Sequence, residues 1–196
     1  MQNERASTSP QMSVEWRGEE VASMDVVILR VIHIGSGMFW VGGVFTFFLF
    51  VQPAAVALGP GGAPFTFQLL RHRRFAAVLL SAATVTVLAG IWLLVITSSG
   101  LNPDMLFSTS RIGFTVGGVA AILTLGVGGL YVFPRTQIVE RTLGQMLGEQ
   151  RPPTPDEQAA LARAGRESRA AGWVVMFGLA VAVICMETAT YWSLFL

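Results

Sequence analysis

The sequence predicts an all-α membrane protein: a four-helix transmembrane bundle with a short cytoplasmic helical pair between the third and fourth helices. Of the 196 residues, 53% are hydrophobic and only 13% are charged, which is too apolar for an ordinary soluble domain. A bilayer core needs about 20 apolar residues in helical form, because backbone groups in lipid must bond within their own segment. The stretches that meet this requirement are 26–51, 75–98, 112–133 and 170–196.

The chain divides into a polar N-terminal tail, 1–23, and a membrane domain, 24–196. The apolar stretch after the tail is too long for the h-region of a signal peptide, so we expect a retained first helix. A single cysteine, Cys185, excludes an internal disulfide. The net charge of +1 argues against nucleic acid as a partner.

Proline and glycine mark the ends of the spans. Gln52-Pro53 is expected to close the first span, and a loop rich in glycine follows at 59–62. Asn102-Pro103-Asp104 separates the second span from the third. Pro134 should end or kink the third span, because proline lacks the N–H that a helix needs and its ring crowds the preceding turn.

The long loop 135–169 is predicted to form two cytoplasmic helices. The third span is expected to continue past Pro134, and Thr154-Pro155-Asp156-Glu157 has the pattern of a helix start, with Thr as N-cap and Glu at the capping-box position. The second helix should run on into the fourth span. As a whole the loop is either a solvated connector or a docking site for a partner.

Arginine, which supplies all the positive side chains, predicts the orientation. The side of the first and third loops has nine arginines and the other side has four, so the positive-inside rule places these loops in the cytoplasm and both termini outside. We therefore expect a multi-pass protein of the bacterial inner (cytoplasmic) membrane. The nine are Arg71, Arg73, Arg74, Arg135, Arg141, Arg151, Arg163, Arg166 and Arg169; the four are Arg5, Arg17, Arg30 and Arg111.

A weak internal repeat relates the first and third spans. Three residues of the first span recur 81 positions later, which predicts two helical hairpins related by a pseudo-axis along the membrane normal. The matches are Arg30 with Arg111, Gly37 with Gly118, and Pro53 with Pro134.

Ionisable residues inside a span are energetically costly, and His33 and Glu187 stand out among them. His33 is about nine residues inside the outer end of the first span, and Glu187 is nine residues from the C-terminus, so both lie roughly 13 Å deep at helical rise. We therefore expect an intramembrane polar pair of His33 and Glu187.

Several kinds of site remain open for His33. Gly37 and Trp40 share its helix face, and Gly37 leaves space for a flat ligand or a close helix. The pair with Glu187 is either a structural hydrogen bond, with no cofactor, or part of a proton relay. Haem b with His33 as axial ligand is a third interpretation. The fourth is copper bound by His33 and a methionine: Met186, Met24, Met38 or Met105.

Two further patterns indicate contacts with lipid and between helices. Arg71, His72, Arg73 and Arg74 form a basic cluster at the start of the second span, which is expected to bind anionic lipid head groups. Gly113 to Gly117 is a GxxxG pattern, typical of a helix-packing surface.

The first span contains His33-Ile34-Gly35-Ser36-Gly37-Met38-Phe39-Trp40-Val41-Gly42-Gly43. This segment resembles the His-x-x-x-Gly-x-x-Trp-x-Gly signature of CopD-like membrane proteins, including the DUF2269 group, and is more distantly similar to HemJ-type protoporphyrinogen oxidases. Arg74-Phe75, Gly90-Ile91-Trp92-Leu93-Leu94, the Pro-Thr-Pro-Asp-Glu turn and the segment 186–192 extend the likeness. It implies a membrane bundle of four or more helices, with copper handling or haem b binding through His33. HemJ-type enzymes also use a lysine on the next helix, and this chain has none.

Three functions from different classes follow from the sequence. The first is a haem b- or copper-associated site, for redox chemistry or metal handling, centred on His33 near the outer face. The second is a non-catalytic accessory subunit of a larger energy-transducing membrane complex. The third is a small transporter with Glu187 as its proton-coupled acid. The expected partners are the lipid bilayer and other membrane subunits or further copies of the chain.

Overall fold

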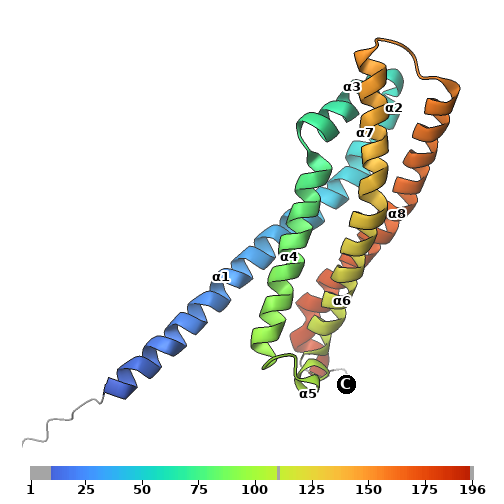
Figure 1. Cartoon of the computed structure of the whole chain (residues 1–196). Coiled ribbons are helices and arrows are strands. Elements are labelled where there is room, and N and C mark those ends of the chain that lie inside the picture. Colours follow the sequence, from blue (N-terminus) through green and yellow to red (C-terminus); the bar gives the residue numbers. More distant parts are fainter. Residues whose placement is uncertain (1–9, 110, 195–196) are drawn as a thin grey trace, which may run out of the picture.

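The computed structural model describes residues 10–109 and 111–194, and in these ranges the chain consists of helices joined by short turns, with no strand (Figure 1). Four helical segments are long and apolar enough to cross a membrane: Met24–Ala57, Phe75–Thr97, Ile112–Gly148 and Pro155–Trp192. The predicted all-α fold with four membrane-spanning helices is therefore confirmed. Of the expected polar tail, residues 1–9 lie outside the described residues, and the rest belongs to the first helix.

The elements follow one another in a simple order. They are α1 (Pro10–Thr46), η1 (Phe47–Val51), α2 (Gln52–Ala57), η2 (Gly59–Gly61), α3 (Gly62–Phe67), η3 (Gln68–His72), α4 (Phe75–Thr97), α5 (Pro103–Leu106), α6 (Ile112–Val127), η4 (Gly128–Val132), α7 (Phe133–Gly148), α8 (Pro155–Thr188) and η5 (Ala189–Leu194). Among them η1, η3 and η4 are π-helical segments, whereas η2 and η5 are 3-10 turns.

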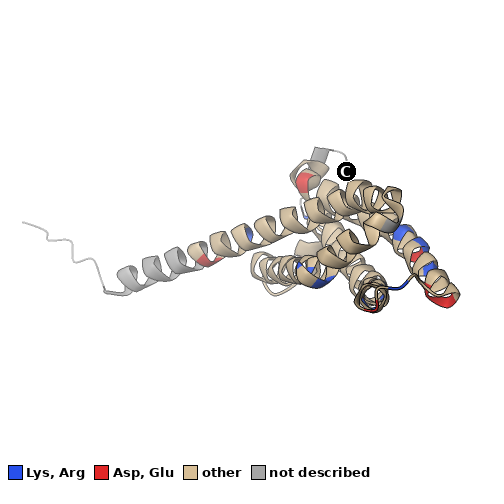
Figure 2. Ribbon diagram, turned by 90° about the horizontal axis from the view of Figure 1, so that it is seen from above, with Lys and Arg blue, Asp and Glu red and all other residues tan. Residues whose placement is uncertain are grey.

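The four spans run alternately up and down (Figure 1). The start of α1, the short α5 and the end of α8 lie at one end, and α2, α3 and the turn between α7 and α8 lie at the other. The first and third loops thus share an end, as four alternating spans require. Figure 1 shows the N-terminal half of α1 leaning away from the other helices, and in Figure 2 many of the charged residues lie on the first half of α8, away from the middle of the bundle.

The core joins the two hairpins at mid-height. Its buried residues come from α1, α4, α6 and α8, and Leu179, at 1% exposure, is the most completely buried large side chain. Many large apolar side chains face outward instead, as expected where lipid surrounds the spans. The core residues are Trp40, Val44, Ala83, Val87, Ala121, Val175, Met176, Leu179 and Ala182.

The GxxxG pattern brings α6 and α8 into backbone contact, as the sequence predicted. A Cβ atom added at Gly113 would lie 2.7 Å from the carbonyl oxygen of Cys185 and 2.8 Å from the Cα atom of Ala189. A Cβ atom added at Gly117 would lie 2.9 Å from the carbonyl oxygen of Ala182. Only residues without a side chain allow two helices to approach this closely.

The expectation that Gln52-Pro53 closes the first span is wrong, because the helix continues to Ala57. Immediately before Pro53, the helix widens into the π-helical η1, where the Gln52 N–H donates to the carbonyl oxygen of Phe47, five residues back. The wider turn relieves the crowding that a proline ring causes in an α-helix. Pro134 shows the same arrangement, since the Phe133 N–H donates to the carbonyl oxygen of Gly128.

The two π-helical segments also bear on the predicted repeat. Phe47 and Gly128, where η1 and η4 begin, are 81 positions apart, and each segment ends two residues before its proline. The widened turn before the proline therefore recurs at the same spacing in the two spans. The correspondence does not extend to every side chain, since a Cβ atom at Gly37 would meet Thr86 whereas the space at Gly118 is open.

The helical pair between the third and fourth spans is confirmed as α7 and the first half of α8. Thr154 caps α8 with the predicted capping box: its hydroxyl accepts from the Glu157 N–H at 3.3 Å, and Glu157 accepts from the Thr154 N–H at 2.8 Å. Arg151 adds a two-pronged ion pair to Glu157 at 2.6 and 2.7 Å. These contacts hold the turn between α7 and α8.

The turn should lose stability in acid through Glu157. Its hydrogen bonds to Arg151 and to the Thr154 N–H lower the pKa of Glu157 from 4.5 to about 2. A lowered carboxylate pKa contributes stability that is complete above pH 4.5 and disappears as the pH falls towards 2. The melting-temperature difference between the wild type and Glu157→Gln should therefore be present at pH 6 and vanish near pH 2.

Asp156→Asn is the matched control, since it removes a carboxylate from the same helical turn without touching Arg151. A difference for Glu157→Gln that stayed constant down to pH 2 would contradict the role given to the carboxylate.

Candidate functional site

His33 lies between α1 and α4, half-buried, with its ring across Gly90. Its Nδ1 atom is 2.7 Å from the carbonyl oxygen of Thr86, one turn before Gly90 on α4. A Cβ atom at Gly90 would come within 2.7 Å of the His33 Cε1 atom, so the missing side chain makes the room for the imidazole. Thr86 and Gly90 of α4 thus provide the hydrogen-bond acceptor and the space for the His33 ring.

The hydrogen bond determines which ring nitrogen has the proton. A carbonyl oxygen only accepts, so Nδ1 of His33 donates to Thr86 and Nε2 is the nitrogen with the free lone pair in the neutral ring. Histidines that bind metal or haem iron are usually oriented in this way, by an Nδ1–H bond to a backbone carbonyl. The geometry therefore suits His33 for ligation through Nε2.

A second polar contact strengthens the same helix interface. The Thr86 hydroxyl lies 2.8 Å from the Ser36 hydroxyl oxygen, which itself donates to the carbonyl oxygen of Ile32 at 2.6 Å. Gly37 faces the Thr86 methyl group, which a Cβ atom there would approach to 3.3 Å. Of the two uses expected for the space at Gly37, the structure shows the close helix and not room for a flat ligand beside it.

The structure does not join His33 and Glu187 as a hydrogen-bonded pair. His33 bonds to α4, whereas Glu187 is exposed on α8, and the described residues include no hydrogen bond between the two. Depth along a helix follows from hydropathy, but the neighbouring side chain depends on how each helix is rotated. Gly90 turns His33 towards α4, and Gly113 with Gly117 turn the opposite face of α8 towards α6.

The Met186 side chain packs against α6 and not against His33. It packs over Gly117 of α6, where a Cβ atom would lie 2.7 Å from the Met186 Cγ atom. Met38 is 70% exposed on α1, and the described residues hold no group of three or more His, Cys, Asp or Glu side chains that could bind a metal ion. Met186 thus contacts α6, and copper binding by His33 with a methionine stays a prediction.

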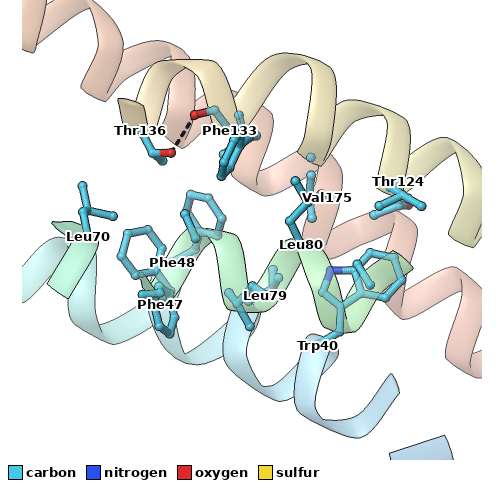
Figure 3. Close-up of a pocket in the computed structure, with 17 residues that line it drawn as sticks. Trp40, Phe47, Phe48, Leu70, Leu79, Leu80, Thr124, Phe133, Thr136 and Val175 are labelled. Carbon is cyan, nitrogen blue, oxygen red and sulfur yellow. Dashed lines mark hydrogen bonds between the residues drawn. The ribbon is translucent and has the colours of Figure 1, made fainter. Parts of the chain in front are cut away.

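Trp40 belongs to the core and to an apolar pocket that the sequence did not predict. The pocket has a volume of about 80 Å³ and is lined by residues of all four spans. Figure 3 shows the side chains converging, with Trp40 at one end and Leu70 at the other. Residues of η1 and η4 both contribute, among them Phe47, Phe48 and Gly128. In the sequence, the feature that relates to this pocket is the pair Pro53 and Pro134, which follow η1 and η4.

The basic cluster of Arg71, His72, Arg73 and Arg74 lies between the pocket-lining residues Leu70 and Phe75. All four side chains of the cluster are exposed. Arg71 pairs with Glu140 at 3.2 Å, and His72 packs edge-on against the Phe67 ring. Arg74 adopts the left-handed conformation, with φ of 50°, and so turns the chain sharply from η3 into α4.

Comparisons of the chain with protein-family models, with curated proteins and with solved structures gave no match. The likeness of the first span to CopD-like proteins therefore remains an expectation from the residues quoted above.

Proposed function

We propose that the chain is a multi-pass protein of the bacterial inner membrane, with both termini outside, that binds haem b through Nε2 of His33. The observation that supports this proposal is the 2.7 Å hydrogen bond from His33 Nδ1 to the Thr86 carbonyl oxygen. It leaves Nε2 as the ligating nitrogen and fixes the ring plane. Haem, when bound, would supply one-electron redox chemistry.

The residues around His33 fit haem ligation better than a closed metal site. One histidine suffices as a protein ligand for haem iron, whereas a copper site needs several donors close together. The other histidine, His72, lies beyond the opposite end of α4, so one copy of the chain supplies one histidine. Because Thr86 fills the space beside Gly37, the haem plane would have to lie away from that face.

An absorption spectrum of the purified protein, before and after titration with haemin, tests the proposal. The wild type should show a Soret band that His33→Ala abolishes and His72→Ala leaves unchanged. Gly90→Ala keeps the ligand but displaces the imidazole, so its band should weaken or shift. Haemin binding that is equal in the wild type and in His33→Ala, or absent from both, would overturn the proposal.

A second candidate function, a non-catalytic subunit of a larger membrane complex, is favoured by the orientation of α1. The outer half of this helix leans away from the bundle (Figure 2) and exposes large side chains around it. Val31 is 66% exposed and Met38 is 70% exposed. Such a helix offers a surface for another membrane subunit as well as for lipid.

Crosslinking in native membranes tests the second candidate. In a Cys185→Ala background, Val31→Cys should give a crosslinked product with another subunit, whereas Phe177→Cys, on the lipid-exposed face of α8, should not. If neither gives a product, α1 contacts lipid alone.

A further inference from the structure

The apolar pocket is suited to a hydrocarbon chain. Its lining includes two hydroxyl groups, and both are already used. Thr124 donates to the carbonyl oxygen of Ala120 at 2.7 Å. Thr136 donates to the carbonyl oxygen of Phe133 at 2.7 Å, the bond drawn in Figure 3. Apart from the indole N–H of Trp40, the side chains of the lining offer a polar ligand no free group to replace its hydrogen bonds to water. A volume of about 80 Å³ accommodates several methylene groups. In a membrane the hydrocarbon at hand is a lipid acyl chain.

The position of the pocket points to one class of lipid. The pocket-lining residues Leu70 and Phe75 enclose Arg71 to Arg74 in the chain, so the basic cluster lies beside that end of the pocket. Arg71 is paired with Glu140, but Arg73 and Arg74 are exposed, and the described residues give neither an ion pair. Two guanidinium groups next to an apolar pocket complement a phosphate group attached to an acyl chain.

We propose that an anionic phospholipid binds here, with part of one acyl chain in the pocket between η1 and η4 and its phosphate at Arg73 and Arg74. The site is built by both halves of the repeat, since Phe47 and Phe48 come from η1, and Gly128 and Val132 from η4. The arginines that would hold the phosphate lie before the start of α4, whereas His33 contacts Thr86 and Gly90 further along that helix.

Lipid binding is measured on the full chain, purified in detergent, by native mass spectrometry and by melting temperature. Phosphatidylglycerol should remain bound in the mass spectrum and raise the melting temperature, and phosphatidylcholine at the same concentration should do so much less. Glycerol phosphate, which lacks acyl chains, should have no effect. Equal stabilisation by glycerol phosphate would show an anion site without a lipid pocket and would overturn the proposal.

Two pairs of variants separate the head group from the acyl chain. Arg73→Gln with Arg74→Gln should weaken phosphatidylglycerol binding about tenfold or more, while Arg141→Gln with Arg169→Gln, an equal loss of charge at exposed sites, should not. Ala76→Phe fills the pocket and should abolish retention of the lipid, whereas Ala77→Phe, exposed on the next position of α4, should retain it.

Ala76→Leu is a smaller replacement that serves the same purpose if Ala76→Phe does not fold. Binding that is unchanged in the arginine variant, or in a folded variant with the pocket filled, would contradict the proposal. The haem spectrum of each variant should equal that of the wild type, which keeps this result separate from the test of His33.

Discussion

Gly113→Ala should lower the free energy of unfolding by about 1–3 kcal/mol, the usual cost of overpacking a close interface. The new methyl group would meet the carbonyl oxygen of Cys185 and the Cα atom of Ala189, at 2.7 and 2.8 Å. Both atoms belong to the backbone of α8 or its continuation, so no side-chain rotation relieves the contact. The two helices would have to separate along the interface that organises the second hairpin.

Gly118→Ala is the matched control for this prediction. It lies on the same helix, and a Cβ atom there meets nothing within 4 Å. Because alanine is favoured over glycine in a helix by about 0.8–1 kcal/mol, the control should be neutral or slightly stabilising. Unfolding in mixtures of mild detergent and sodium dodecyl sulfate measures both variants. Equal stability of the two would show that α6 and α8 are not in backbone contact.

Leu179→Ala should be the most damaging truncation of a core side chain, with a loss of about 2–5 kcal/mol. Leu179 is 1% exposed and lies where all four spans meet. The cost in a bilayer comes chiefly from the cavity and the lost van der Waals contacts, because lipid also solvates an exposed leucine.

Phe177→Ala removes a larger side chain from the same helix and should change stability by no more than about 0.5 kcal/mol. Phe177 is 73% exposed, so its ring makes few contacts within the chain. The same unfolding assay compares the two variants. A Phe177→Ala variant as unstable as Leu179→Ala would mean that another protein surface, and not lipid, covers that face of α8.

Hydropathy predicted the membrane-spanning helices because the bilayer imposes a length and a composition that can be read one segment at a time. Capping is just as local, so the start of α8 at Thr154-Pro155 could be predicted from four residues. The end of the first span could not be predicted in this local way. Pro53 is a helix breaker by itself, but the widened turn of η1 accommodates it and the helix continues.

The candidate site could be predicted only in part. The sequence identified His33 as a residue that needs a partner, and it assigned Glu187 on the basis of depth. The partner in the structure is the backbone carbonyl group of Thr86. Every residue has such a group, so a sequence pattern cannot indicate which one is used. Gly90, which makes room for the ring, is one of 21 glycines, and its position beside His33 depends on the packing of α1 against α4.

The continuity of α8 has a mechanical consequence. Over its 34 residues the helix contains no π-helical segment, in contrast to the first and third spans, and it is about 51 Å long. This unbroken helix connects the ion pairs at its start to the interface with Gly113 at its end. A pivot of about 10° around its middle would move each end by roughly 4 Å, so a force applied at Glu157 would be felt on the far side of the bilayer.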